Sequence, residues 1–329
     1  MKQIKTLFLL ILLIILVGCS NKVTTYNNNY FYMDTYINVK IYSNNKNLVI
    51  KAFKEINNIY QEYHQLSDRY QSYDNLINLY YINHNLDINK EIIINEKLYD
   101  MIKYSIDFYH KSNGLLNIAL GNVIDVWKQY REEGIGIPTE KELMESGSID
   151  IDNIILSDKA IMKKNNIKID LGAIAKGYAT EKVGQYLESI GLNQYIINAG
   201  GNVKVGSHYQ DDNYTIGVED PNDTTEIYQV IKGNNMVVVT SGGYERFYEY
   251  KGQKYHHIID PNTLFPPQYM QAVTVICDNS AYGDALSTIL FLMPIETGIN
   301  YINNLDNVEA VWYGLDNQIY YSEGFDKYA

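Results

Sequence analysis

Two kinds of segment follow one another along most of this 329-residue chain. In one kind the apolar residues are spaced as on one face of a helix, and in the other they are spaced as on one face of a strand. Hydrophobic and polar residues alternate over Tyr36–Ile41, within a segment at 30–42 that is expected to form an opening strand with one buried face. Between Val49 and Tyr63, apolar residues recur at intervals of three and four, the spacing of one helical face. No internal repeat, proline-rich linker or block of like charges marks a domain boundary. We therefore expect one domain in which helices and strands are mixed.

The same two spacings place the later elements. Asn113-Gly114 and Gly191 are expected to end two of the helices, because Gly and Asn readily adopt the conformation of a helix C-terminal cap. The expected helices are at about 98–109, 175–190 and 285–292, and the expected strands are at 195–197, at 272–276 and within 214–240.

The first residues have the pattern of a signal peptide. Lysines at positions 2 and 5 precede an apolar run over Leu7–Val17, and small Gly18 is followed by Cys19. The run is about half as long as the ~20 residues that a helix needs to cross a bilayer. The Gly18-Cys19 pair is similar to the cleavage and lipidation site of bacterial lipoproteins, and a plain secretory signal with a chance cysteine is the alternative.

Three regions are therefore expected: a signal peptide at 1–18, a polar tether at 19–29 that begins with lipidated Cys19, and a folded domain at 30–329. Acyl chains, palmitate among them, would attach the protein to the membrane, each buried methylene contributing roughly 0.8 kcal/mol. No second hydrophobic run of spanning length follows. The expected location is the extracytoplasmic side of the cell membrane.

The composition is that of an ordinary globular protein, with 46% hydrophobic and 20% charged residues, and it excludes a mostly disordered or fibrous chain. The formal net charge is −12, from 27 Lys and Arg against 39 Asp and Glu. Because this charge repels phosphate backbones, general nucleic-acid binding is not expected. The two cysteines, Cys19 and Cys277, offer no disulfide to the mature domain, because Cys19 lies at the end of the export signal.

The segment Asp170–Tyr178 joins a strand-like stretch at 167–169 to the start of an expected helix. Backbone amides at a helix start, together with Lys176, are suited to an anion such as a phosphate. The glycines at 172 and 177 also suit an ordinary tight turn. The segment alone leaves both interpretations open.

Two further segments, Asn198–Asn202 and Thr240–Arg246, contain paired glycines and are followed by the neighbouring histidines His256 and His257. Adjacent imidazoles suggest zinc, but neighbours in a strand point to opposite faces. Neither a His-x-x-x-His pair nor a cysteine set is present. A zinc site is therefore not expected.

Asp284 and Thr288 lie four residues apart in an expected helix and so share one helical face. A carboxylate and a hydroxyl oxygen on one face suit a hard cation such as magnesium. The structural alternative is that Asp284 caps the helix and Thr288 is a buried hydroxyl bonded to the preceding turn.

The order of these segments resembles one family. Over about residues 33–293 the chain looks like an ApbE-type FAD:protein FMN transferase, a flavin transferase that is commonly exported as a lipoprotein. Any one segment is a weak signal, whereas seven in the same order are a strong one. The segments that carry the resemblance are Met33-Asp34-Thr35, Leu66-Ser67 with Ser72 and Asn78, Asp170–Tyr178, Asn198–Gly201, Ser241-Gly242 with Tyr244–Arg246, His257–Pro261 with Thr263, and Asp284–Thr288.

The resemblance implies a single α+β domain, with mixed β-sheets and flanking helices, and a role for each matching residue. His257 is implied as the acid/base group, since an imidazole accepts a proton near neutral pH. The implied magnesium ligands are the carbonyl of Ala173, Asp284 and Thr288, with Ser287 as a further oxygen nearby. The implied FAD contacts are Met33, Ala119, Leu120, Gly121, Asp170, Lys176 and Ile258.

The implied activity is the magnesium-dependent transfer of FMN from FAD to a Ser or Thr hydroxyl of an acceptor flavoprotein, which forms a phosphoester and releases AMP. Relatives recognise a short acceptor motif that contains Asp and Ser or Thr. Two alternatives stay open: an FAD pyrophosphatase, in which water replaces the hydroxyl, and a lipid-anchored carrier that holds FAD without turning it over.

The chain departs from the family pattern at three places. The segment Gly114–Asn122 lacks an aromatic residue, a carboxylate, a hydroxyl and a proline that relatives usually show. Asn202 replaces a frequent Asp, and Leu264 replaces the Gly expected after Thr263.

Overall fold

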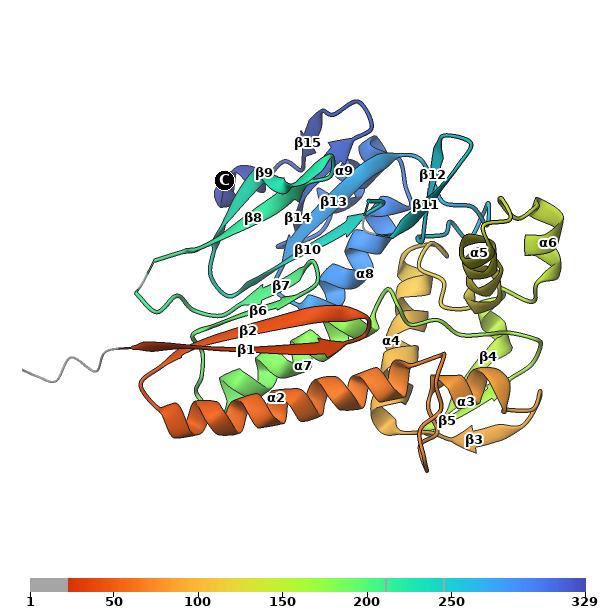
Figure 1. Ribbon diagram of the computed structural model, residues 1–329, viewed down its shortest axis with the longest axis horizontal. Helices are drawn as coiled ribbons and strands as arrows, with labels where there is room; N and C mark the ends of the chain where they lie inside the picture. Colours follow the sequence, from red (N-terminus) through yellow and green to blue (C-terminus); the bar gives the residue numbers. More distant parts are fainter. Residues whose placement is uncertain (1–22, 211, 245) are drawn as a thin grey trace, which may run out of the picture.

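The computed structural model describes residues 23–210, 212–244 and 246–329. Within them the largest sheet has eight strands, and all neighbouring pairs in it are antiparallel (Figure 1). In spatial order the strands are β1 (Thr24–Tyr32), β2 (Thr35–Ser43), β6 (Tyr195–Ala199), β7 (Asn202–Val205), β10 (Met236–Gly242), β13 (Met270–Cys277), β14 (Glu309–Gly314) and β15 (Ile319–Tyr321).

Strands β1 and β2 form a hairpin whose turn consists of Met33 and Asp34, both with positive φ. The single strand expected at 30–42 is therefore two strands.

The predicted polar tether at 19–29 is wrong for residues 24–29, because they belong to β1. In β1, Tyr26 and Tyr30 lie on the inner side of the strand, while Asn27 and Asn29 between them are exposed. The Tyr30 hydroxyl donates to the carbonyl of Phe53 in the neighbouring helix at 2.8 Å. The run of asparagines hides this alternation in the sequence.

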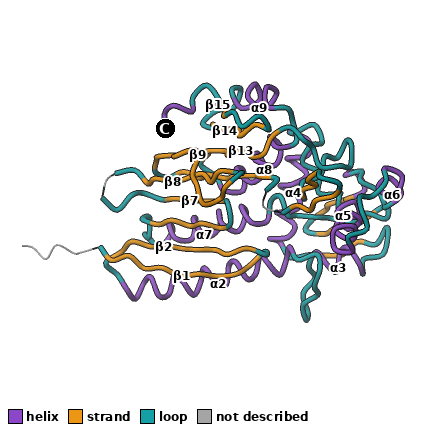
Figure 2. Tube along the Cα trace, turned by 45° about the horizontal axis from the view of Figure 1, so that its top comes forward, coloured by secondary structure: helices purple, strands orange, loops and turns teal. Residues whose placement is uncertain are grey.

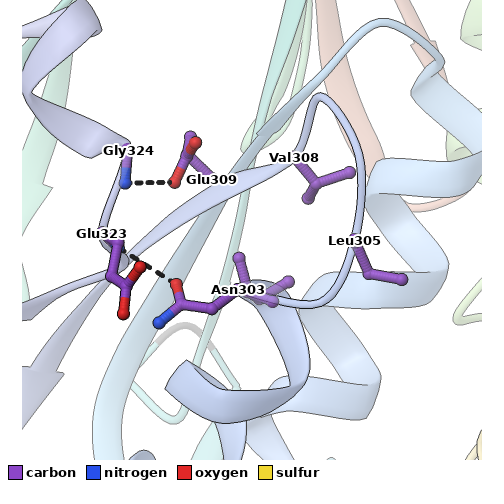
Figure 3. Close-up of a pocket in the computed structure, with 7 residues that line it drawn as sticks. Asn303, Leu305, Val308, Glu309, Glu323 and Gly324 are labelled. Atoms are coloured by element: carbon purple, nitrogen blue, oxygen red, sulfur yellow. Dashed lines mark hydrogen bonds between the residues drawn. The ribbon is translucent and has the colours of Figure 1, made fainter.

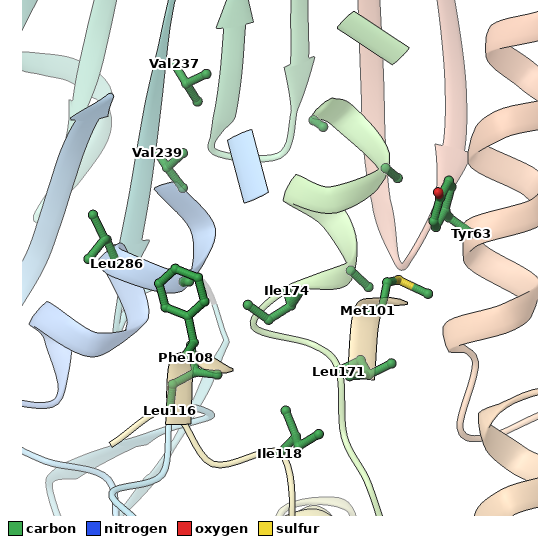
Figure 4. Packing of buried hydrophobic residues seen from close by; sticks show 14 of the residues in the cluster. Tyr63, Met101, Phe108, Leu116, Ile118, Leu171, Ile174, Val237, Val239 and Leu286 are labelled. Carbon is green, nitrogen blue, oxygen red and sulfur yellow. The ribbon is translucent and has the colours of Figure 1, made fainter. Parts of the chain in front are cut away.

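Three helices cover one face of the sheet: α2 (Lys46–Ser67), α7 (Ala175–Ser189) and α8 (Ser280–Phe291) (Figure 2). Their apolar sides and the inward residues of the sheet form the main core, in which Val237 and Val239 of β10 face Leu286 of α8 (Figure 4). The helices therefore hold their loops in fixed positions relative to the strand ends.

The opposite face of the sheet is covered by the hairpin of β8 (Tyr214–Asp220) and β9 (Asp223–Gly233) and by the 3-10 helix η2 (Phe325–Tyr328). Val238 of β10 packs on this side, whereas its neighbours Val237 and Val239 pack on the helices. This explains the unbroken apolar run in β10, since a strand buried on both faces has no solvent-facing positions.

The remaining elements gather at one end of the sheet, on the right of Figure 1. A small separate core joins α5 to the β11–β12 hairpin and includes Val123, Trp127 and Leu264. Elsewhere on this side, β3, β5 and β4 form a three-stranded sheet. These elements are α3 (Leu79–His84), β3 (Glu91–Ile93), α4 (Glu96–Lys111), α5 (Gly121–Glu133), α6 (Glu140–Glu145), η1 (Ile151–Asn153), β4 (Ile154–Ser157), β5 (Ala160–Lys163), β11 (Phe247–Tyr250) and β12 (Gln253–His256).

The predicted α+β fold is confirmed. The helices expected at 98–109 and 175–190 correspond to α4 and α7, and the strands expected at 195–197 and 272–276 correspond to β6 and β13. Helix α8 starts at Ser280, before the expected 285, because Asn279 caps it by accepting from the amide of Tyr282. A last short helix, α9 (Ile295–Ile302), precedes β14. None of the helices in the described residues is both long and apolar enough to cross a membrane.

Candidate functional site

Three chain turns that are far apart in sequence meet at one end of the large sheet. Thr35 at the start of β2 lies against Gly200, whose missing Cβ would stand 2.0 Å from the Thr35 hydroxyl oxygen. Asn202 in β7 pairs with Val239, so the end of β10 lies at the same edge. Gly200 in the β6–β7 turn is therefore required by a close approach to Thr35.

Asp284 is the buried centre of this site, with 5% of its surface exposed. Its Oδ2 accepts from the backbone amide of Gly177 at 2.6 Å, and its Oδ1 accepts from Asn202 Nδ2 at 2.7 Å and from Lys176 Nζ at 3.2 Å. Asp284 lies inside α8, four residues after Ser280, so the alternative that it caps the helix is wrong.

The close contact of α7 with α8 depends on Gly177. A Cβ at this position would stand 2.4 Å from the carbonyl oxygen of Ser280 and 2.8 Å from the Asp284 carboxyl group. The amide of Gly177 is in the first turn of α7, where backbone amides have no partner within the helix. A carboxylate is favoured there, because it also interacts with the positive end of the helix dipole.

Two protein oxygens, one in the turn before α7 and one in α8, are candidates to join Asp284 as ligands of a hard cation. Because Gly177 donates to Asp284, the carbonyl of Ala173 receives no hydrogen bond from that amide, nor from another group in the described part of the chain. The half-buried Thr288, one helical turn after Asp284, has a hydroxyl without a partner among the described residues. Ser287 is engaged, since it accepts from Ser241 at 2.9 Å and donates to the Asp284 carbonyl.

This donor set fits magnesium, which prefers oxygen ligands and retains several waters. It contains one carboxylate, one carbonyl and one hydroxyl. Across residues 23–210, 212–244 and 246–329, no group of three or more His, Cys, Asp or Glu side chains is placed to hold a metal ion. A metal here would accordingly need further ligands from water or from a bound substrate.

Arg69 forms a second part of the site. Its side chain is 5% exposed, and it donates to Asp170 Oδ2 at 2.8 Å, to Asp125 Oδ1 at 2.7 Å and to the carbonyl of Gly121 at 2.8 Å. Lys168 pairs with the other oxygen of Asp125 at 2.7 Å. Arg69 thus ties the start of α5 to the loop before α7.

Two groups of predicted FAD contacts are brought together by this network. Asp170 is held by Arg69 and accepts from the amide of Gly172, and the backbone of Gly121 is bonded to both Arg69 and Lys168. The side chains of Ala119 and Leu120 are buried.

Met33 and Ile258, the other predicted FAD contacts, lie on different elements. Met33 lies in the β1–β2 turn, where its amide donates to His64 Nδ1 at 3.3 Å. Ile258 is half-buried beside His257.

His257 is connected to the β1–β2 turn through Arg246. The guanidinium of Arg246 donates to the Asp34 carbonyl at 3.2 Å and pairs with its carboxylate at 3.3 Å. His257 Nδ1 lies 3.3 Å from the Arg246 carbonyl, and since a carbonyl only accepts, this contact places the proton on Nδ1 and leaves Nε2 as the acceptor.

The imidazole of His257 has an exposed side, but its surroundings disfavour the charged form. Desolvation by protein atoms is the main cause, and the positive charge of Arg246 adds to it, so that the pKa of His257 is lowered from 6.5 to about 4. The side chain is therefore neutral at pH 7 and able to accept a proton.

His256 and His257 point in opposite directions, as expected for neighbours at the end of a strand. His256 is buried against Phe291, and its Nε2 lies 2.8 Å from the carbonyl oxygen of Pro267. Desolvation lowers its pKa as well. The two imidazoles do not form a joint metal site.

The structure shows the surroundings of two of the departures from the family pattern, the segment at 114–122 and Leu264. Leu116 and Ile118 of the 114–122 segment are buried in the main core, and Asn117 bonds to the amide of Ala119 and to the carbonyl of Ile149. Leu264 has φ +63°, a conformation that costs a branched side chain about 1 kcal/mol or more and that explains why glycine is expected there.

A surface hollow between α9 and the start of β14 lies at the opposite end of the sheet (Figure 3). Glu309 and Asn303 in its wall are already bonded, Glu309 to Lys327 and Gly324, and Asn303 to the amide of Glu323. Glu309 pairs with Ile276, far from Ala272 at the site end of β13. The hollow is thus separate from the site.

A lysine and a helix start beside a buried carboxylate, with further oxygen atoms near it in the fold, have the chemistry to bind a phosphate-bearing substrate and a hard cation. The model of a family described as the ApbE family matches residues 33–312, and the chain therefore belongs to the ApbE family.

Two relatives that align with most of this chain share one name. An FAD:protein FMN transferase of Klebsiella pneumoniae (strain 342) is 26% identical over 286 residues, covering 85% of this chain and 86% of the relative. An FAD:protein FMN transferase of Treponema pallidum (strain Nichols) is 29% identical over 253 residues, covering 71% and 70%.

Solved structures of the family have the same fold. The ApbE protein of Thermotoga maritima superposes with a TM-score of 0.84 at 26% identity, covering 93% of this chain and 99% of that one. The flavin transferase ApbE of Vibrio cholerae reaches 0.78 at 21% identity, covering 93% and 100%, and supports the fold alone.

Sequence reasoning missed Arg69, Asp125 and the Asp34–Arg246 pair as parts of the site. Arg69 lies within the segment that begins with Leu66-Ser67, so its position in a motif was the one available signal. Asp125 lies in a helix that the sequence analysis did not predict. Cys19, the predicted lipidation site, lies outside the described residues.

We expect Arg69→Met to lower the free energy of unfolding by about 2–3 kcal/mol, because it leaves two partly buried carboxylates and a buried carbonyl without their donor. Urea denaturation monitored by circular dichroism measures this loss. Arg131→Met, at an exposed position of α5, is the control and should change stability by less than about 0.5 kcal/mol. Equal losses in the two variants would contradict the structural role of Arg69.

Proposed function

We propose that this protein transfers FMN from FAD to a Ser or Thr hydroxyl of an acceptor protein, with magnesium bound at Asp284. Membership of the ApbE family and the names of its relatives, FAD:protein FMN transferases, support the transfer. The observation that carries the proposal is the buried Asp284 carboxylate, which Lys176 and the first turn of α7 contact. The Ala173 carbonyl and the Thr288 hydroxyl, which have no hydrogen-bond partner among the described residues, add to it.

In this proposal, Lys176 binds the pyrophosphate of FAD, since its ammonium group and the positive end of α7 both attract anions. The amides of Ala175, Gly177 and Tyr178 already have acceptors within the protein. Asp284, Thr288 and the carbonyl of Ala173 would hold the magnesium ion. When bound, magnesium neutralises the charge that develops on the phosphate oxygens.

The chemical step needs a base that accepts the proton of the attacking hydroxyl group. The acceptor hydroxyl oxygen forms a bond to the phosphorus on the FMN side of FAD, and the bond from that phosphorus to the bridging oxygen breaks. AMP leaves with the electron pair, and the hydroxyl proton passes to Nε2 of His257. The neutral imidazole and its Nδ1 contact with Arg246 support this role.

We expect Asp284→Asn to abolish magnesium-dependent transfer, because the substitution removes the one carboxylate of the proposed metal site. Residues 20–329 are incubated with FAD and an acceptor peptide containing Asp and Thr, with magnesium or EDTA, and both AMP and peptide-bound flavin are followed. Asp278→Asn, at an exposed position just before α8, is the matched control and should retain activity.

The products formed by the wild-type protein distinguish three functions: a transferase, a pyrophosphatase and a carrier. AMP with peptide-bound FMN supports the transferase. AMP with free FMN indicates a pyrophosphatase, and bound but intact FAD indicates a carrier. Full transfer by folded Asp284→Asn at saturating FAD would remove the metal assignment.

If His257 is the base, kcat/KM should keep its neutral-pH value well below pH 6.5 and fall only as the pH approaches about 4, where the imidazole becomes protonated. The sign follows from the depressed pKa, since a base is active in its deprotonated form. Initial rates between pH 4.5 and 8 measure the profile, with circular dichroism confirming that the protein stays folded.

His257→Gln should lower kcat at least about 100-fold at every pH in this range, because it removes the proton acceptor. His84→Gln, on the exposed side of α3, serves as the control. An acidic limb centred at pH 6.5 in the wild type would argue against the neutral, desolvated His257 as the base.

We also propose that the mature protein is a lipoprotein anchored through Cys19 on the extracytoplasmic side of the membrane. The proposal rests on the lysines, the apolar run at 7–17 and the Gly18-Cys19 pair. We expect cells expressing the full chain to incorporate labelled palmitate into the protein, and Cys19→Ser to remove the label. Label retained in Cys19→Ser would refute the anchor, and Cys277→Ser is the control.

A further inference from the structure

Lys176 occupies a position at Asp284 that a metal ion would also need. Its Nζ is 3.2 Å from Asp284 Oδ1, the same oxygen that accepts from Asn202. We propose that Lys176 is a built-in substitute for the cation: it neutralises Asp284 in the metal-free protein, is displaced when a divalent cation binds, and then contacts the phosphates of the substrate. This proposal rests on the proposed metal site.

The three donors around Asp284 differ in how freely they can move. Gly177 donates from the backbone of α7. Asn202 is fully buried in β7, and its Oδ1 accepts from Ser280 at 2.6 Å, which fixes the orientation of the amide. Lys176 alone reaches the carboxylate with a long flexible side chain, 23% of which is exposed. It is therefore the donor that a cation can replace.

The burial of Asp284 explains why a substitute is needed. An unpaired carboxylate with so little exposed surface is strongly unfavourable, and the two neutral N–H donors supply no net charge. Among the described residues, Lys176 is the one basic side chain paired with Asp284, and Lys204 pairs instead with Glu181 at 3.0 Å. The metal-free site is thus stabilised by an internal ion pair.

A divalent cation at the same oxygen would repel the ammonium group, because two positive charges within a few Å of each other cannot both be accommodated in a poorly solvated site. The ammonium group leaves through the side on which Lys176 is exposed. A pyrophosphate bound beside the metal offers it a new anionic partner. Metal and substrate therefore favour each other's binding, and the effect is reciprocal.

The test is Mn²⁺ binding to the metal-free protein without FAD, followed by the electron paramagnetic resonance signal of free Mn²⁺. Lys176→Met should bind Mn²⁺ at least tenfold more tightly than the wild type, because the competing ammonium group is gone. Lys327→Met is the matched control: Lys327 pairs at 3.1 Å with Glu309, a carboxylate that is 12% exposed at the opposite end of the sheet, so its removal should leave Mn²⁺ affinity within about twofold.

Thermal melting gives an independent readout. Without metal, Lys176→Met should melt below the wild type, and saturating Mg²⁺ should raise its melting temperature by more than it raises that of the wild type. Equal or weaker Mn²⁺ binding by folded Lys176→Met would overturn the exchange while leaving the metal site intact. Absence of binding in both proteins, or unchanged binding in Asp284→Asn, would overturn the metal site and the exchange together.

Discussion

The hydrogen bond from the Gly177 amide to the Asp284 carboxylate is the constraint on which the rest of the site depends. It joins the start of α7 to the interior of α8, and it is possible because residue 177 has no side chain to separate them. One consequence is local. The Gly177 amide donates to Asp284 and not to the Ala173 carbonyl four residues before it, so that this carbonyl has no hydrogen bond from the described residues. Another consequence is electrostatic. The negative charge of the buried Asp284 carboxylate has to be balanced by a positive charge or by hydrogen-bond donors close to it.

The antiparallel sheet solves the problem of assembling this site from distant segments. Antiparallel strands that follow one another bring the chain back to the same end of the sheet. The β1–β2 turn, the β6–β7 turn and the end of β10 therefore lie together at that end. Helices α7 and α8 pack on one face of the sheet (Figure 2), and Lys176 of α7 meets Asp284 of α8 beside Asn202 of β7. Residues more than two hundred positions apart, such as Asp34 and Arg246, meet as a result.

Sequence patterns located the strongly amphipathic elements, such as α2 and α4, because their apolar residues follow one period. They did not resolve β1, whose asparagines interrupt the alternation, nor the early start of α8, where the cap at Asn279 precedes the apolar run. At the site, Asp170, Lys176 and Asp284 were predicted in advance, whereas Asn202 was noted only as a departure from the family pattern. Arg69 was not predicted, because its role arises from three partners that are close in space and remote in the chain.

The place where β1 begins has a consequence for the proposed anchor. Only residues 20–23 separate Cys19 from Thr24, and the five steps between these two residues span at most about 18 Å when fully extended. From Thr24, β1 leads along its length of roughly 30 Å to the Met33-Asp34 turn beside the site. With lipid on Cys19, the domain would stand close to the bilayer, and the site end of β1 would lie within about 50 Å of it. The acceptor hydroxyls that such an enzyme modifies would lie within the same distance of the membrane.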